Sequence, residues 1–215
     1  MRGINIMITD VSNVDFLEML SSKAPIPGGG SASAFVGAIG TALAGMVANL
    51  TKGKKKYAEY ENDVIAIAKK AEKIIEKLTL LMEKDIEVFE PLSKAYALPK
   101  ETPEEQERKE AIMEACLKKA AAVPLEIMET VTKAIDFHEE LLKKGSRMAI
   151  SDVGVGIVFC KAAIQGASLN IFINTKYMKD REYAKKLNDC ANELLENTIK
   201  RADKIFVKVY KLLES

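Results

Sequence analysis

Asp85 is the residue of this sequence whose position points most clearly to acid–base chemistry. Residues typical of a helical core recur at alternating steps of four and three between Val64 and Phe89, and Asp85 takes one place in that row. A carboxyl group buried in such a row is costly unless it is paired, and burial raises its pKa. A carboxyl group of this kind is suited to proton transfer near neutral pH. The competing interpretation is a structural ion pair with a lysine of a neighbouring helix.

A second carboxylate, Asp152, follows Ser151 at the expected start of a helix. Carboxylates at this place interact favourably with the free N–H groups and with the helix dipole, so a cap or a first-turn acid is the simpler interpretation. The helix that Asp152 opens is very apolar. Its first turn is therefore also a candidate for an interior site.

A glycine-rich segment, Pro25–Ala34, reads Pro-Ile-Pro-Gly-Gly-Gly-Ser-Ala-Ser-Ala. Its three glycines precede a helix for which Ser31 is the expected cap. Glycines let a backbone approach a ligand, and free N–H groups at a helix start bind an anion or a carbonyl oxygen. No Gly-Lys-Ser/Thr follows and no strand precedes the segment, which argues against a nucleotide P-loop and a dinucleotide-binding fingerprint. From these residues alone, a tightly packed turn and a ligand-binding loop are equally good interpretations.

Several other polar residues have simple structural interpretations. Lys52 ends the second expected helix, where a cation interacts favourably with the dipole, although it could also reach an acidic ligand. Asn170 and Asn174 lie four residues apart, where they either line a polar cleft or satisfy backbone groups. His138 is expected at the surface or boundary of the fourth helix. No set of His, Cys, Asp and Glu has the spacing of a metal site.

These residues fall on expected helices or on the turns between them. The pattern predicts six helices, over about 14–23, 31–52, 59–90, 104–144, 151–174 and 180–213, and residues 3–8 are a weak candidate for an extended segment. Pro91 is expected to end the third helix, and Pro124 to kink or split the fourth. The sequence therefore predicts an all-α fold, a bundle of about six helices, several of them long, in one domain of residues 1–215.

The second and fifth helices are rich in small residues, which let a neighbouring backbone come close. The run from Ser31 to Leu50 is twenty residues without a charge, and several lysines follow it. Its length and flank match a membrane span, but its Ala, Gly, Ser and Thr content lacks the large apolar residues that drive insertion. A buried helix in a tightly packed core is the better interpretation, with a membrane helix as the alternative.

The overall composition favours an ordinary globular protein and excludes some partners. The chain carries 32 basic and 31 acidic residues, so a nucleic-acid partner, which would need a basic excess on one face, is not expected. Cys116, Cys160 and Cys190 fit no zinc or redox motif, and their odd number is a poor disulfide framework. The sequence therefore predicts a cytoplasmic protein with reduced thiols, since residues 1–15 also lack the pattern of a signal peptide.

Four segments together with Asp85 carry a resemblance to a known family. They are the glycine-rich segment Pro25–Ala34, the Leu-Thr-Lys-Gly-Lys run at 50–54, the Ser-Asp-Val-Gly-Val-Gly run at 151–156 and the Asn-Ile-Phe-Ile-Asn run at 170–174. In these segments the chain resembles the formiminotransferase-cyclodeaminase family, in its stand-alone cyclodeaminase or methenyltetrahydrofolate cyclohydrolase form. The likeness covers nearly the whole chain.

The resemblance implies an all-helical homodimeric enzyme that acts on a tetrahydrofolate derivative without a metal or another cofactor. It implies formimidoyltetrahydrofolate cyclodeaminase activity, in which N10 attacks the formimino carbon and ammonia leaves. One alternative is a methenyltetrahydrofolate cyclohydrolase, in which water attacks the methenyl carbon and opens the ring. Another is a non-catalytic helical protein that binds folate or serves as a scaffold.

The resemblance also implies roles for the residues singled out above. Asp85 becomes the acid–base group, and Asp152 orients the pterin or assists proton transfer. Substrate binding is assigned to Gly28, Gly29, Gly30, Ser31, Lys52 and Asn170. The glycines and the serine would cradle the substrate at the helix start, the lysine would meet the glutamate carboxylate of the folate, and the asparagine would line the cleft.

Overall fold

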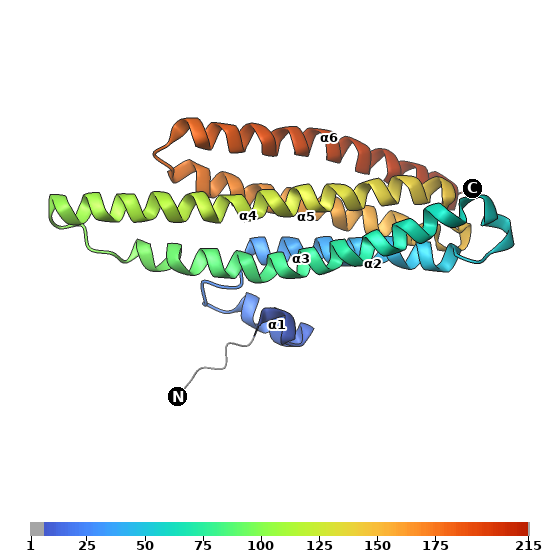
Figure 1. The fold of residues 1–215 in the computed structure, drawn as a ribbon, viewed down its shortest axis with the longest axis horizontal. Helices are drawn as coiled ribbons and strands as arrows, with labels where there is room; N and C mark the ends of the chain where they lie inside the picture. The colour runs from blue at the N-terminus through green and yellow to red at the C-terminus, as the bar shows by residue number, and fades with distance from the viewer. Residues whose placement is uncertain (1–6, 215) are drawn as a thin grey trace.

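The computed structural model describes residues 7–214, and helices make up almost all of this range (Figure 1). The α-helices are α1 (Asn13–Ser21), α2 (Gly29–Thr51), α3 (Glu61–Tyr96), α4 (Pro103–Lys144), α5 (Ile150–Tyr177) and α6 (Arg181–Glu214). Three short 3-10 helices lie at Ile8–Asp10, Lys55–Tyr60 and Arg147–Ala149. The described residues contain no strand, which confirms the predicted all-α bundle of about six helices. Most of the extended candidate at 3–8 lies outside the described residues, and its described end enters a 3-10 helix at Ile8.

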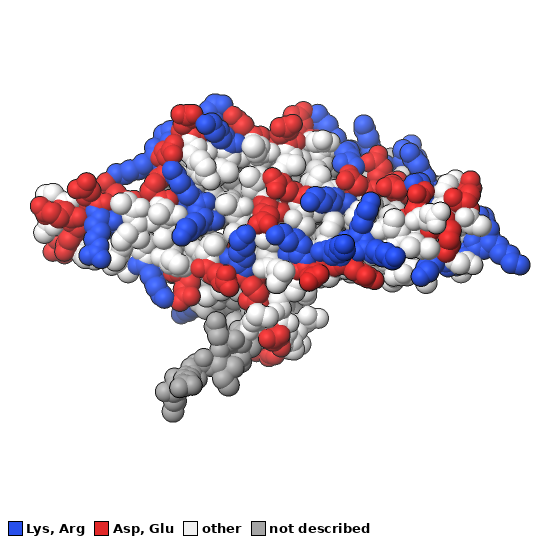
Figure 2. Space-filling model, in the orientation of Figure 1, with Lys and Arg blue, Asp and Glu red and all other residues white. Residues whose placement is uncertain are grey.

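The four helices α2 to α5 form the centre of the bundle. Helix α2 packs against α3 and α5, while α4 packs against α3 and α5 on the opposite side. Helix α6 lies along α5 and α4, and α1 lies outside the bundle, below the start of α2 in the view of Figure 1. Over the face drawn in Figure 2, basic and acidic side chains are interspersed without a broad area of one sign.

Glycines bring α2 very close to its neighbours, as the small-residue pattern predicts. A Cβ atom on Gly37 would lie 2.6 Å from Cγ2 of Val131, and one on Gly40 would lie 2.7 Å from Sγ of Cys160. Real Cβ atoms do not approach other heavy atoms so closely, because packed interiors already stand at van der Waals contact. The small residues of α2 therefore serve the packing of this buried helix.

The structure contradicts the predicted helix end at Pro91 and a split at Pro124. Helix α3 continues through Pro91 to Tyr96, and α4 is continuous across Pro124. An internal proline removes one backbone hydrogen bond, but tertiary packing can outweigh that loss. Leu92 of α3 is fully buried, and Pro124 itself lies in the core, so burial of the following turns holds both helices together.

His138 is fully buried, which contradicts its expected place at the surface or boundary. Its Nε2 atom lies 3.0 Å from the carbonyl oxygen of Gly40, and Nδ1 has no hydrogen-bond partner within the described residues. A Cβ atom on Gly156 would lie 2.2 Å from Cε1 of the ring. Gly156 of α5 thus makes the space for this imidazole, and Gly40 of α2 supplies its carbonyl partner, a relation between distant residues that periodicity in α4 does not reveal.

The buried His138 is expected to make the fold sensitive to acid. Desolvation lowers the pKa of His138 to about 4, whereas the unfolded chain has the ordinary value of 6.5. The unfolded state therefore binds more protons between these values, so this contribution to stability is complete above pH 6.5 and is lost as the pH falls towards 4. Between pH 7.5 and 4.5 the loss is about 2–3 kcal/mol. Urea unfolding at pH 7.5 and 4.5 should show this loss in the free energy of unfolding of the wild type. The loss should be about 2–3 kcal/mol smaller in His138→Gln. An equal loss in both proteins would show that His138 does not cause it.

Helices α2 and α5 are also the most apolar elements of the bundle. Both Gly29–Thr51 and Arg147–Tyr177 are long and apolar enough to cross a membrane by length and composition, but 61% of the α2 window is buried inside the protein. That burial supports the core interpretation of α2. The outward side of the two helices remains apolar and exposed at Ile39, Met46, Leu50, Val155, Val158, Leu169 and Ile173.

Candidate active site

Asp85 of α3 meets the first turn of α2. Its Oδ2 atom accepts hydrogen bonds from the backbone N–H of Ser31 at 2.8 Å and from the Ser31 hydroxyl at 2.9 Å. Ser31 is fully buried, and its hydroxyl also lies 3.1 Å from the carbonyl oxygen of Met82. Helix α2 begins at Gly29 with Gly28 as its N-cap, so Ser31 is not the cap that the sequence indicates. It lies inside the first turn and anchors the carboxylate of another helix.

The surroundings of Asp85 favour the protonated form of its carboxyl group more than water does. Desolvation raises its pKa, while the two hydrogen bonds from Ser31 partly oppose that shift. Asp85 forms no ion pair within the described residues, so the lysine partner of the structural interpretation is missing there. Its Oδ1 atom has no hydrogen-bond partner in the described part of the chain. One carboxyl oxygen is therefore fixed by Ser31, while the other is available to a ligand.

A pocket of about 150 Å³ opens beside Asp85. It is lined by Pro25, Ile26, Gly28, Gly29, Gly30, Asp85, Val88, Phe89, Ala120, Asn170, Ile173 and Asn174. Its walls come from the start of α2 and from α3, α4 and α5, so four segments far apart in the sequence meet at one place. The structure thus brings together Asp85, the three glycines and Asn170, with Ser31 directly behind the carboxylate.

Close packing leaves no room for a side chain at Gly30 and little room for one at Gly29. A Cβ atom on Gly30 would lie 2.1 Å from Oδ1 of Asp85, and one on Gly29 would lie 3.2 Å from Nδ2 of Asn170. Nothing lies within 4 Å of a Cβ atom built on Gly28. Gly30 therefore lets the carboxylate lie against the first turn of α2, which supplies N–H groups and the positive end of the dipole.

The two asparagines of α5 form the polar wall of the pocket. Nδ2 of Asn170 donates to the carbonyl oxygen of Gly166 at 2.9 Å, and Nδ2 of Asn174 donates to that of Asn170 at 2.7 Å. Nδ2 of Asn174 also lies 3.3 Å from the carbonyl oxygen of Ala120. Their amide oxygens have no partner among the described residues, so both can accept hydrogen bonds from a ligand.

Asp152 and Lys52 lie at the other end of the bundle. Asp152 precedes Asn170 by eighteen residues of α5, which is about 27 Å at the rise of an α-helix. Lys52 is the C-cap of α2 and follows Gly28 by twenty-four residues, about 36 Å. The structure does not bring these two residues to the Asp85 pocket within one chain. Their roles in the site stay predictions.

No role in the site follows from the sequence for the apolar walls of the pocket. Phe89 follows Asp85 by four residues, so it lies on the same helical face, and this spacing was a usable signal. Ala120 and Ile173 give no such signal, because nothing in their local pattern sets them apart from other core residues. Across the part of the chain that the structure describes, no group of three or more His, Cys, Asp and Glu could hold a metal ion.

Comparison with known proteins identifies the family of this chain. A sequence model described as formiminotransferase-cyclodeaminase matches residues 12–193. The chain belongs to the formiminotransferase-cyclodeaminase family. The matched range contains the whole pocket, and membership identifies the chain as an enzyme of folate one-carbon chemistry.

Relatives within the formiminotransferase-cyclodeaminase family carry two activities. A methenyltetrahydrofolate cyclohydrolase of Methylorubrum extorquens is 38% identical over 93% of this chain and 94% of its own length. A formimidoyltransferase-cyclodeaminase of Mus musculus is 31% identical over 88% of this chain, which spans only 35% of the mouse protein. The crystal structure of a formiminotetrahydrofolate cyclodeaminase from Thermotoga maritima superposes with a TM-score of 0.79 and 32% identity, covering 95% of this chain and 96% of that one.

Proposed function

We propose that this protein is a methenyltetrahydrofolate cyclohydrolase, in which Asp85 is the acid–base group. The observation that carries the proposal is the half-buried carboxyl group of Asp85, with Oδ2 held by Ser31 and Oδ1 free beside the pocket. The 38% identity to a cyclohydrolase over nearly the full length of both chains supports this choice of reaction. Tetrahydrofolate derivatives are accordingly the proposed substrates.

The proposed reaction places one proton on Asp85 and then returns it. The carboxylate takes a proton from water as the water oxygen bonds to the methenyl carbon, giving a tetrahedral carbon between N5 and N10. Asp85 then protonates N5 as the bond from carbon to N5 breaks and the hydroxyl proton passes to solvent. The product is 10-formyltetrahydrofolate, with one proton released overall. A carboxyl group with a raised pKa can perform both steps.

The second candidate is the cyclodeaminase activity that the sequence resemblance implies. Support comes from the Thermotoga maritima cyclodeaminase, which matches 95% of this chain in structure. In this reaction N10 attacks the formimino carbon, Asp85 accepts the N10 proton, and protonation of the departing nitrogen releases ammonia. Because both reactions pass through a tetrahedral carbon between two nitrogens, the same carboxyl group serves either one. A non-catalytic scaffold has less support, since Asp85 lines a pocket and forms no ion pair within the described residues.

A second copy of this chain is the proposed partner of the exposed apolar face of α2 and α5. This face carries Ile39, Met46, Leu169 and Ile173. Large exposed apolar surfaces mark association sites, and a homodimer is the assembly that the sequence resemblance implies. A twofold axis across α2 would place the far end of one copy near the pocket of the other. Only such a partner could bring Asp152 and Lys52 to the site.

Two assays on the same preparation test the proposed reaction. The protein should be purified without detergent and its mass in solution measured, with a dimer expected. The absorbance of methenyltetrahydrofolate should fall in its presence faster than in buffer, and ammonia release from 5-formiminotetrahydrofolate should be slow in comparison. Rapid ammonia release with no effect on methenyltetrahydrofolate hydrolysis would favour the cyclodeaminase instead. Neither reaction above the buffer rate would contradict both candidates.

A further inference from the structure

The hydroxyl group of Ser31 has two acceptors for one hydrogen atom. Its Oγ atom lies 2.9 Å from Oδ2 of Asp85 and 3.1 Å from the carbonyl oxygen of Met82. A hydroxyl group carries a single donor hydrogen, so these two oxygens compete for it. The outcome of that competition depends on which of the two oxygens is the stronger acceptor at a given moment.

Burial restricts the Ser31 hydroxyl to these two acceptors. Ser31 is fully buried and Met82 is buried beside it, so bulk water does not reach the hydroxyl group. A buried hydroxyl group without an acceptor is strongly disfavoured. The carbonyl oxygen of a residue inside an α-helix accepts one backbone N–H and keeps a second lone pair, which Met82 can offer to Ser31.

The backbone N–H of Ser31 determines which oxygen of Asp85 takes up a proton. This N–H donates to Oδ2 at 2.8 Å, and an N–H group cannot turn round to accept a hydrogen bond. Oδ2 therefore remains an acceptor in both protonation states of the carboxyl group. Oδ1 has no hydrogen-bond partner in the described part of the chain, and Asp85 lines the pocket. The proton is accordingly expected on Oδ1.

The charge on Asp85 decides the competition for the Ser31 hydrogen. A hydrogen bond to an ionised acceptor is roughly twice as strong as one between neutral groups, so the ionised carboxylate takes the hydrogen. With a proton on Oδ1, Oδ2 becomes the carbonyl oxygen of a neutral acid, which is a weaker acceptor than the amide oxygen of Met82. The hydroxyl group then reaches Met82 by rotation of its hydrogen about the Cβ–Oγ bond, and no heavy atom has to move.

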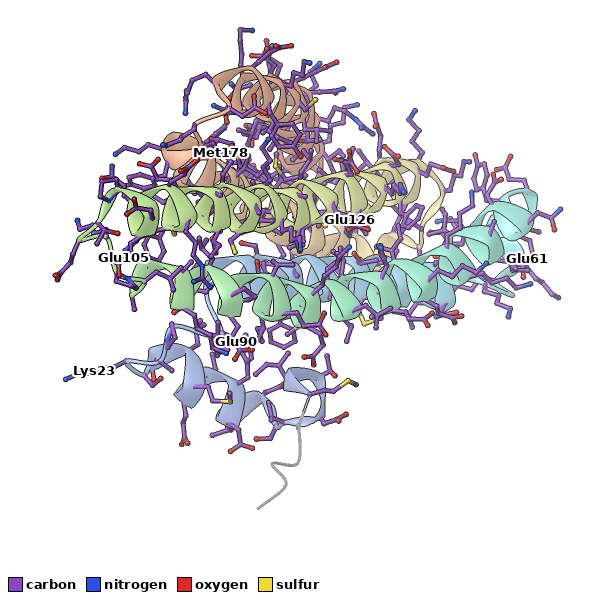
Figure 3. The ribbon with its side chains drawn as sticks, turned by 60° about the vertical axis from the view of Figure 1, so that its left-hand side comes forward. Lys23, Glu61, Glu90, Glu105, Glu126 and Met178 are labelled. Carbon is purple, nitrogen blue, oxygen red and sulfur yellow. The ribbon has the colours of Figure 1, made fainter. Side chains whose placement is uncertain are left out.

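The charged groups around Asp85 are engaged elsewhere. Helix α2 has no charged residue, and the residues of α4 and α5 that line the pocket are uncharged. On α3, Lys84 pairs with Glu126 of α4 (Figure 3), and Glu83 accepts from a backbone N–H of the first 3-10 helix. Burial raises the pKa of Asp85, and the two hydrogen bonds from Ser31 lower it. Among the described residues, the Ser31 hydroxyl is therefore the donor to this carboxyl group that can turn away.

We propose that Ser31 is a positioning residue whose hydroxyl group donates to Asp85 while the carboxyl group is ionised and turns to the Met82 carbonyl oxygen when Oδ1 takes up a proton. Its role in turnover rests on the proposed function. As the water oxygen bonds to the methenyl carbon, one water proton passes to Oδ1 and the hydroxyl group turns to Met82. As the bond from carbon to N5 breaks, Oδ1 gives that proton to N5 and the hydroxyl group turns back. Ser31 keeps its own hydrogen throughout, and the buried hydroxyl group is hydrogen-bonded in both states.

The test removes the hydroxyl group and follows the titration of Asp85 without substrate. The ¹³Cγ resonance of Asp85, assigned with Asp85→Asn, would be titrated in the wild type, Ser31→Ala and Ser31→Thr. Loss of a donor to the ionised form should raise the pKa of Asp85 by about 1 in Ser31→Ala, and Ser31→Thr, which keeps a hydroxyl group, should restore the wild-type value. The acidic limb of kcat should move by the same amount, with kcat about tenfold lower and KM unchanged. The matched control Ser168→Ala, which removes a buried hydroxyl group that donates to Gln165, should change none of these quantities.

Infrared spectroscopy separates a turning hydroxyl group from a fixed one. Below the pKa of Asp85, its carboxyl C=O stretch should have the same frequency in the wild type and in Ser31→Ala, whereas a lower frequency in the wild type would show that the hydroxyl group still donates to Oδ2 and would overturn the proposal. An unchanged pKa of Asp85 in a folded Ser31→Ala would overturn it as well. If the wild type has no turnover but Ser31→Ala raises that pKa and keeps the C=O frequency, the proposed function fails and the hydroxyl switch stands. Ser31→Cys, whose thiol is a weak donor, replaces any variant that circular dichroism shows to be unfolded, and its pKa of Asp85 should lie above the wild-type value.

Discussion

Replacement of Asp85 by asparagine is expected to lower turnover by about a thousandfold, within the range that a positioned acid–base group contributes. Asparagine has nearly the same shape, and its amide oxygen can still accept the hydrogen bond from the Ser31 backbone N–H. It cannot take a proton from water or return one to N5. The loss should therefore fall on kcat, while KM changes little.

The carboxylate of Asp85 also has a structural role at the start of α2. The fold of Asp85→Asn should nevertheless remain intact, because the amide can take over that contact. Asparagine keeps an acceptor for the first-turn N–H group and removes a desolvated charge, so the free energy of unfolding should change by no more than about 1 kcal/mol. Urea unfolding and circular dichroism would measure that change. Glu76→Gln, an exposed charge-to-amide change on the same helix, is the matched control and should keep both activity and stability. Turnover within threefold of wild type in Asp85→Asn would show that another group moves the proton.

The pH profile gives a second measure of the same residue. Because desolvation raises the pKa of Asp85, the base form is lost at a higher pH than for an ordinary aspartate. The rate of the wild type should therefore fall on the acidic side as the pH drops through that raised value. The residual rate of Asp85→Asn should lack this acidic limb. An unchanged limb in the variant would assign it to a different group.

Much of the arrangement around Asp85 is predictable from sequence, because it rests on local patterns. The regular steps between Val64 and Phe89 predict a bundle helix, and an aspartate in that row must find a polar partner or a functional role. The glycines before Ser31 indicate a close approach of the backbone, although the sequence does not say what approaches. The structure supplies the missing relation, because it places the Asp85 carboxylate against Gly30 and Ser31.

Other features depend on contacts between distant helices, which a local pattern does not contain. The resemblance groups Asp85 with Asp152 and Lys52, yet the length of α2 and α5 puts the latter two at the far end of the bundle. His138 gives no sign in its own helix that Gly156 has left space for its ring or that the Gly40 carbonyl faces it. The first case depends on positions along the helices, and the second depends on the space between them.

Gly30→Ala is expected to reduce turnover by about a hundredfold or more without touching any ionisable group. The new Cβ atom would lie 2.1 Å from Oδ1 and 2.5 Å from Cγ of Asp85, closer than nonbonded atoms can stand. The first turn of α2 is fixed by the packing of the whole helix, so the aspartate side chain must rotate away. It would then lose the hydrogen bonds from Ser31 and the position of Oδ1 in the pocket. An error of about 1 Å in the position of a catalytic group is enough for such a loss.

Gly45→Ala is the matched control for Gly30→Ala, because it makes the same change in the same helix. Its Cβ atom would lie 3.5 Å from Cβ of Ala71, an ordinary contact. Alanine is a better helix former than glycine by about 0.5–1 kcal/mol, so Gly45→Ala should be at least as stable as the wild type and equally active. Measuring kcat and urea unfolding for both variants separates a general effect of alanine in α2 from displacement of Asp85. If Gly30→Ala keeps wild-type kcat, the carboxylate does not need its place against the first turn of α2, and the proposed geometry of proton transfer is wrong.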